Sequence, residues 1–144
     1  MPKIERKINI ESTPDKIFKI ISDGFNTPKW NPAVESVLEI EDNKIQLDTD
    51  IGGIIVIRTE KEEDKNITWY TENSEMNSIG YNIIPKSEKT SKVNIWTEFD
   101  DKKQSKLFKE TADNILLGLK NYVEYIENGG DPDIYKKWEA LISP

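Results

Sequence analysis

The sequence predicts an α+β protein in which a curved, seven-stranded antiparallel sheet wraps around one long C-terminal helix. Between residues 4 and 100, apolar and polar residues alternate in seven segments, which is typical of half-buried strands. Between residues 104 and 128, apolar residues instead recur every three or four positions, as in an amphipathic helix. A sheet of this kind has an apolar face to cover, and this helix is the only segment long enough to cover it.

The first strand is predicted at residues 4–10, where isoleucines alternate with polar residues. Pro14 then fits the first turn of a helix, because that position needs no backbone donor. The helix ends at Gly24, and a second short helical piece at residues 25–31 is interrupted by prolines. Two short helices are therefore expected between the first strand and the second.

The remaining six strands follow one another with only short turns between them, at residues 34–41, 44–49, 54–62, 67–73, 78–84 and 92–100. Connections this short require antiparallel neighbours, because a parallel pair needs a long crossover. The helix at 104–128 contains Gly118, which costs about 1 kcal/mol relative to alanine.

The chain is expected to form one domain over residues 1–128, followed by a C-terminal tail over residues 129–144. The tail begins with two glycines and is predicted to form a short helix packed on the domain. Its apolar stripe of Ile134, Trp138 and Leu141 is expected to dock on the body, with a dimer contact or a lid over a pocket as the alternatives.

Charge and composition exclude several classes of function. Lys and Arg number 20 and Asp and Glu number 27, so the net charge is −7, which argues against nucleic-acid binding. The chain has no Cys and no His, which removes thiolate catalysis, His-based triads and the usual zinc sites. No apolar run is long enough to span a membrane, and the first ten residues lack a signal-peptide core. We therefore expect a cytoplasmic protein without metal or cofactor.

Strand alternation predicts which side chains face the helix. In the strand at 92–100, Ile95 and Thr97 are expected inward and Trp96 outward, where it packs on neighbouring strands or offers a partner surface. In the strand at 54–62 both faces carry aliphatic residues. We expect Ile57 and Thr59 inward there, because the opposite choice would bury Arg58.

Arg58 itself is expected to point outward in an ion pair with Glu60 or Glu98. If the strand presented its other face, Arg58 would be a fixed cation inside the protein, able to bind a carboxylate or phosphate.

An apolar wall with a few placed polar groups is typical of a small-molecule pocket. The candidate ligand-contacting residues are predicted to face the helix, to lie on the helix itself or to stand at the mouth: Trp30, Ile57, Thr59, Trp69, Thr71, Tyr81, Ile83, Ile95, Thr97, Leu116 and Leu119. The alternative is that these side chains fill a solid core, with Trp30 plugging the base of the sheet. No catalytic residue is assigned.

Four segments, at residues 7–18, 28–37, 91–97 and 115–124, resemble the START/pollen-allergen-like superfamily of helix-grip proteins (SRPBCC), in its polyketide cyclase/dehydrase-like branch. They are similar to its opening strand and helix, its W-x-P-x-V entry to the second strand, its penultimate strand and its gripping helix. The resemblance covers residues 4 to about 128 and implies a cavity that holds a hydrophobic or amphipathic small molecule. Members of the superfamily include lipid carriers, hormone receptors, aromatic polyketide cyclases and activators of a heat-shock ATPase.

The main hypothesis is non-catalytic binding or transport of a hydrophobic, lipid- or polyketide-like molecule. One alternative is a protein-interaction module, or a homodimer, that works through Trp96 or the tail. The other is a cyclase- or dehydratase-type enzyme, in which proton transfer would fall to Tyr81, Glu98 or another carboxylate.

Overall fold

One antiparallel sheet holds all seven strands in the computed structural model, which describes residues 2–42, 44–49, 52–72 and 74–142. The strands are β1 (Lys3–Ile10), β2 (Val34–Glu41), β3 (Lys44–Thr49), β4 (Gly52–Glu62), β5 (Asn66–Glu72), β6 (Met76–Pro85) and β7 (Ser91–Phe99). Their order across the sheet is β1-β7-β6-β5-β4-β3-β2, so the last strand pairs with the first. The short turns expected after the second, third and fifth strands include Asn43, Asp50 and Asn73, which lie outside the described residues.

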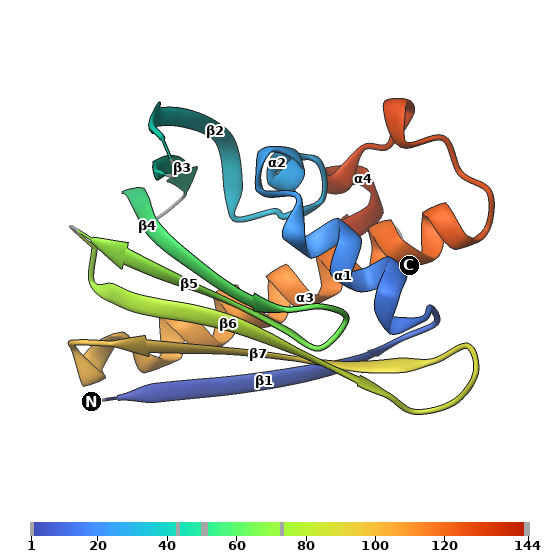
Figure 1. Cartoon of the computed structure of the whole chain (residues 1–144), viewed down its shortest axis with the longest axis horizontal. Coiled ribbons are helices and arrows are strands. Elements are labelled where there is room, and N and C mark those ends of the chain that lie inside the picture. Colours follow the sequence, from blue (N-terminus) through green and yellow to red (C-terminus); the bar gives the residue numbers. More distant parts are fainter. Residues whose placement is uncertain (1, 43, 50–51, 73, 143–144) are drawn as a thin grey trace.

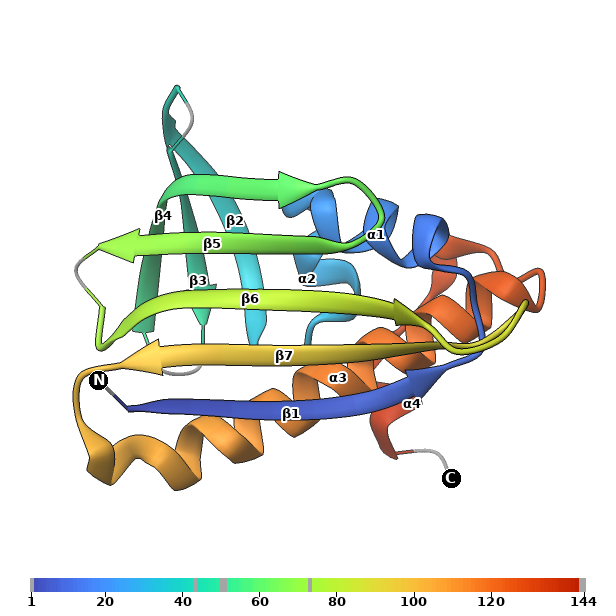
Figure 2. The ribbon, with the colours of Figure 1, turned by 60° about the horizontal axis from the view of Figure 1, so that its bottom comes forward.

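The helices are α1 (Pro14–Ser22), α2 (Thr27–Trp30), α3 (Ser105–Glu127) and α4 (Lys137–Ile142), with single 3-10 turns at Gly24–Asn26, Lys102–Gln104 and Pro132–Ile134. The 23-residue α3 runs along the concave side of the sheet, and α1, α2 and α4 gather around its C-terminal half (Figures 1 and 2). The predicted fold class, a curved sheet gripping one long helix, is confirmed.

The free edge of β1 is closed by α3 through polar contacts. Lys120 Nζ donates to the carbonyl of Asn9 at 3.2 Å, and Arg6 forms a bidentate pair with Asp113 at 2.8 and 3.0 Å. These contacts hold the helix against one side of the sheet, so that its apolar face is turned toward the inner side chains of the strands.

The inward face of β4 differs from the prediction. Ile54 and Val56 are buried, whereas Ile57 is 42% exposed. The pairing with β5 shifts register between Val56 and Arg58, which makes Ile57 the extra residue of a β-bulge. β4 bends strongly along its length, as bulged strands do (Figure 2). The inward placement of Ile57 is therefore wrong, because simple alternation does not reveal a bulge.

The bulge also explains why Arg58 stays outside although its strand presents Ile54 and Val56 inward. One extra residue restores the outward position, where the Arg58 guanidinium stacks over the Tyr70 ring at 4.0 Å. Its Nη2 lies 3.5 Å from Glu60, which is the outward ion pair that the sequence predicts. Arg58 therefore supplies no charge to the interior.

The tail packs on the body, but through other residues than its apolar stripe. Lys137 Nζ donates to the carbonyls of Asn31 and Val34 at 2.8 and 2.7 Å, and the Tyr135 ring packs against Tyr122 at 5.0 Å. The side chains of Ile134 and Trp138 are 69% and 52% exposed, so the expected docking of the stripe through these two residues is wrong. The ammonium group of Lys137 binds these two carbonyls where the chain turns into β2, and Trp138 stays outside.

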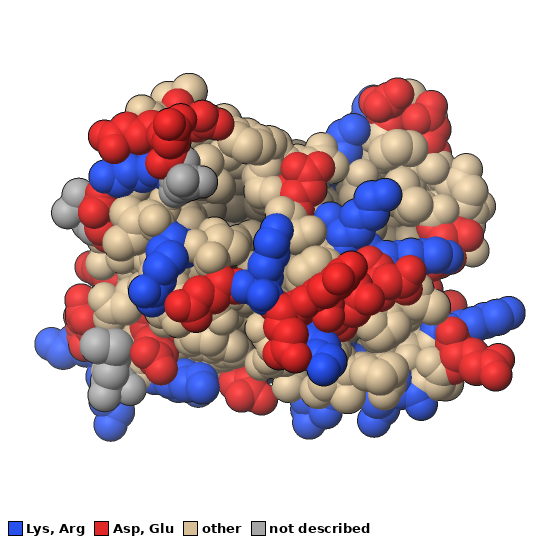
Figure 3. All heavy atoms as spheres, viewed as in Figure 1, with Lys and Arg blue, Asp and Glu red and all other residues tan. Residues whose placement is uncertain are grey.

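The surface is strongly charged. Acidic side chains gather at the tip of the β2–β3 hairpin, where Glu39, Glu41 and Asp42 are exposed, and the surface beside that hairpin is hollowed (Figure 3). Among the described residues, no helix combines the length and the apolar composition that crossing a membrane requires.

Candidate ligand-binding site

The space between the sheet and α3 divides into a packed end and a hollow end. At the packed end, Ile17 and Ile21 of α1 are completely buried, and Leu116 and Leu119 of α3 are buried with them. At the other end, the N-terminal half of α3 faces the sheet across a cavity of about 80 Å³. Helix α1 explains the division, because its buried side chains fill the space at the packed end, whereas α2 reaches the cavity through its first residue, Thr27.

The cavity is walled by both layers of the fold and by the segment that links α2 to β2. Its lining residues are mostly aliphatic or aromatic: Ile4, Thr27, Asn31, Ala33, Val34, Leu47, Thr49, Ile54, Trp69, Met76, Ile79, Tyr81, Ile95, Thr97, Phe108, Thr111, Ala112 and Ile115. An apolar wall with a small number of hydroxyl and amide groups fits a small organic molecule.

Four of the residues predicted to contact a ligand line this cavity: Trp69, Tyr81, Ile95 and Thr97. Trp69 and Tyr81 come from neighbouring strands and meet edge to face, with ring centroids 5.8 Å apart and an interplanar angle of 79°. This contact fixes both rings on the sheet side of the cavity.

Seven predicted residues lie elsewhere. Trp30, Ile83, Leu116 and Leu119 are buried in the packed end, and Thr71 donates a hydrogen bond to the carbonyl of Met76. Thr59 lies opposite Trp69 in the sheet but is exposed, like Ile57, because β4 has bent away from the helix layer there. Strand alternation gives the face of a side chain but not its position along the strand, and position decides which residues meet the cavity.

The buried Trp30 anchors the helix instead of guarding a mouth. Gly118 of α3 lies directly against it: a Cβ atom at this glycine would be 2.6 Å from the Trp30 carbonyl oxygen and 2.6 Å from Pro32 Cδ. The glycine that weakens the helix in isolation therefore allows α3 to approach the α2–β2 link.

Sequence reasoning missed most of the helical side of the cavity. Phe108, Ala112 and Ile115 lie on the apolar face of α3, which was recognised, but nothing in the periodicity separates them from Leu116 and Leu119. Thr27 of α2 and Asn31 of the α2–β2 link were missed as well, because these polar residues carry no periodic signal.

Two wall hydroxyls have no hydrogen-bond partner among the described residues, those of Tyr81 and Thr27. Both residues are 1% exposed. The hydroxyl of Thr97, by contrast, donates to the carbonyl of Ser78 at 2.8 Å. Burial in apolar surroundings raises the pKa of Tyr81 well above its ordinary value, so its phenol stays protonated and can donate a hydrogen bond.

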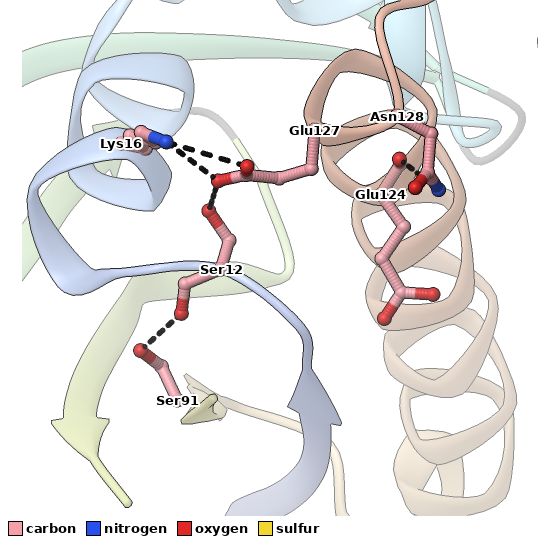
Figure 4. A network of polar contacts seen from close by, with 6 residues as sticks. All are labelled: Ser12, Lys16, Ser91, Glu124, Glu127 and Asn128. Atoms are coloured by element: carbon pink, nitrogen blue, oxygen red, sulfur yellow. Dashed lines mark hydrogen bonds and ion pairs between the residues drawn. The ribbon is translucent and has the colours of Figure 1, made fainter. Parts of the chain in front are cut away.

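A second hollow, of about 340 Å³, lies between α1 and the C-terminal end of α3. Two of the three charged residues that line it are paired: Glu127 accepts a hydrogen bond from Ser12 at 2.5 Å and pairs with Lys16 at 3.1 Å (Figure 4). The Ser12 hydroxyl and then Lys16 lower the pKa of Glu127. Ser91 donates to the Ser12 carbonyl at 2.8 Å, so this network ties α1, β7 and α3 together. We interpret this network as one that stabilises the fold.

Metal or acid–base chemistry finds little support in these residues. Within residues 2–42, 44–49, 52–72 and 74–142, no group of three or more Asp or Glu is placed to hold a metal ion. A neutral tyrosine beside apolar groups can orient a carbonyl or hydroxyl, but its raised pKa makes it a poor proton acceptor at neutral pH. The arrangement is suited to binding.

No protein-family model matches the sequence, nor does any curated protein. Solved structures do resemble it. The protein XoxI from Bacillus cereus superposes with a TM-score of 0.75 at 20% identity, over 88% of this chain and 99% of that one. A START superfamily protein from Mycobacterium smegmatis gives 0.74 at 17% identity, over 86% and 98%. The Zhui aromatase/cyclase from a Streptomyces species gives 0.72 at 11% identity, over 90% and 99%.

These likenesses identify the architecture. The chain has the helix-grip fold that START-like proteins and polyketide aromatase/cyclases share. At identities of 20% or less they show the fold alone, and function has to be argued from the cavity.

Proposed function

We propose that the protein binds a hydrophobic small molecule in the cavity between the sheet and the N-terminal half of α3, and does so without catalysing a reaction on it. The observation that carries this proposal is a hollow walled by apolar side chains from both layers, in a fold whose other end is solidly packed. The fold shared with a START superfamily protein and an aromatase/cyclase supports the binding of a small molecule.

The volume of the cavity limits the size of a ligand that fits without a movement of the wall. A dry cavity of about 150 Å³ accepts benzene in a model protein, so 80 Å³ is small even for one aromatic ring. The ligand is therefore small, or the wall moves outward when it binds. Outside the sheet and α3, the described wall consists of Thr27 of α2 and of Asn31 and Ala33 in the α2–β2 link.

Mass spectrometry of the freshly purified protein tests the proposal. We expect the native spectrum to show a mass excess that disappears on denaturation and returns when the ligand so identified is added back. Substitution Ala112→Leu fills the cavity from α3 and should abolish the excess, because Ala112 is buried on the cavity wall. Asn114→Leu places the same side chain on the exposed face of the same helix and should leave it intact. Equal retention by both variants would contradict the proposed site.

An enzyme of the same fold would behave differently. It would convert a polyketide-like or ester substrate, and Tyr81→Phe would remove turnover while leaving substrate binding measurable. A binding protein shows no conversion with either form.

A further inference from the structure

Two buried hydroxyl groups on the wall of one apolar cavity indicate which class of ligand fits there. Tyr81 and Thr27 line the same cavity, both are 1% exposed, and neither hydroxyl has a hydrogen-bond partner among the described residues. A buried donor without a partner destabilises the folded protein, and most buried hydroxyls in proteins are paired. Here the pairing is missing on two sides of one hollow: Tyr81 belongs to the sheet, and Thr27 begins α2.

The described part of the cavity wall also carries no charged side chain. Among the described residues that line it there is no Asp, Glu, Lys or Arg, and Arg58 is held outside by its stacking on Tyr70. Moving a carboxylate or ammonium group into such surroundings without a counter-charge is strongly unfavourable. A fatty acid or a phospholipid headgroup would therefore have to leave its charged end outside the cavity.

We propose that the ligand is an uncharged, mainly apolar molecule with an oxygen function, a ketone, phenol or alcohol, whose oxygen accepts a hydrogen bond from the Tyr81 hydroxyl and interacts with that of Thr27. This inference rests on the proposed function and narrows it to one ligand class. The Trp69 ring, edge to face with Tyr81 at 5.8 Å, holds the donor in place before the ligand arrives. Little ordering is then needed on binding, which favours affinity.

Three probes of similar size separate the alternatives: ethylbenzene, acetophenone and benzoate. Their dissociation constants are measured by titration calorimetry for the wild type and for the variants Tyr81→Phe and Thr27→Val. Each substitution removes a hydroxyl and nearly preserves the side-chain shape. Tyr70→Phe is the matched control, because that hydroxyl lies on the outer face, 3.3 Å from Glu60.

We expect Tyr81→Phe to weaken acetophenone binding by roughly five- to tenfold and to leave ethylbenzene binding unchanged or slightly tighter. Thr27→Val should act in the same direction with a smaller effect, Tyr70→Phe should change neither, and benzoate should bind weakest to the wild type. Selective loss of the ketone, without loss of the hydrocarbon, is the signature of a hydrogen bond to the ligand oxygen.

Two results would overturn this inference while leaving the proposed function standing. One is an equal change for acetophenone and ethylbenzene in Tyr81→Phe, or no change for either. The other is benzoate binding as tightly as acetophenone. If instead none of the three probes binds and the native mass spectrum shows no adduct, the proposed function itself fails.

Discussion

Gly118 shows how one residue can be unfavourable locally and necessary in the whole protein. It is buried in the middle of α3, where a glycine costs about 1 kcal/mol relative to alanine. A Cβ here would come within 2.6 Å of a backbone oxygen and of a proline ring, neither of which can swing aside. We expect Gly118→Ala to lower the free energy of unfolding by about 1–2 kcal/mol in urea denaturation, because overpacking outweighs the gain in helix propensity.

The control for this residue is Asn114→Ala, at an exposed position of the same helix. Alanine forms helix better than asparagine, so this variant should be equal to the wild type or slightly more stable. A Gly118→Ala protein as stable as Asn114→Ala would mean that α3 does not approach the α2–β2 link as closely as described.

At the scale of elements, α4 binds one segment of the cavity wall and holds it in place. Lys137 Nζ reaches the carbonyls of Asn31 and Val34, two residues that line the cavity. Lys137→Met keeps the aliphatic stem and removes these charge-assisted hydrogen bonds, so we expect a loss of about 1–3 kcal/mol in unfolding free energy. Backbone amides at residues 31–34 should also exchange their hydrogens faster, as measured by mass spectrometry.

Lys136→Met provides the comparison, since Lys136 lies one position earlier. Its side chain forms an exposed pair with Glu139 at 3.9 Å. Exposed pairs of this kind contribute little to stability. If both substitutions had the same small effect, the tail would lie on the body without holding the wall.

The response of the whole molecule to acid follows from several paired carboxylates. The pKa of Glu127 is lowered by the Ser12 hydroxyl and by Lys16, and the pKa of Asp48 is lowered by Ser36 and Gln46. Since these groups bind protons less readily when folded, their stabilisation is complete above their ordinary pKa values of 4.5 and 3.8 and is lost as the pH falls through the lowered ones. We expect the urea midpoint to fall steeply below about pH 4.

Glu127→Gln tests how much the Glu127 carboxylate and its partners contribute to the pH dependence of stability. It should lower stability at pH 7 and flatten the acid part of the curve, because Ser12 and Lys16 lose their carboxylate partner. Glu110→Gln, on the exposed side of the same helix, should leave the shape of the curve unchanged. Identical acid profiles for wild type and Glu127→Gln would show that the contacts of Glu127 with Ser12 and Lys16 do not govern acid stability.

The sequence by itself determined the elements, their antiparallel order and the inward faces of β5, β6 and β7. These features depend on local periodicity and on the length of connections, both of which can be read along the chain. The outward position of Trp96 also follows from alternation: its ring lies against Gly80, which leaves room for it, and under Lys3 at 4.9 Å.

Only the tertiary structure decided where the cavity lies and what it can bind. The side chains of α1 fill one end of the space between the sheet and α3 and leave the other end hollow, and no periodicity distinguishes Ala112 from Leu116. The bulge at Ile57 adds one residue, reverses the facing of β4 and keeps Arg58 outside. The unpaired hydroxyls of Tyr81 and Thr27 depend on every neighbour around them. Such properties are set by contacts between residues far apart in the chain, and therefore only the folded chain shows them.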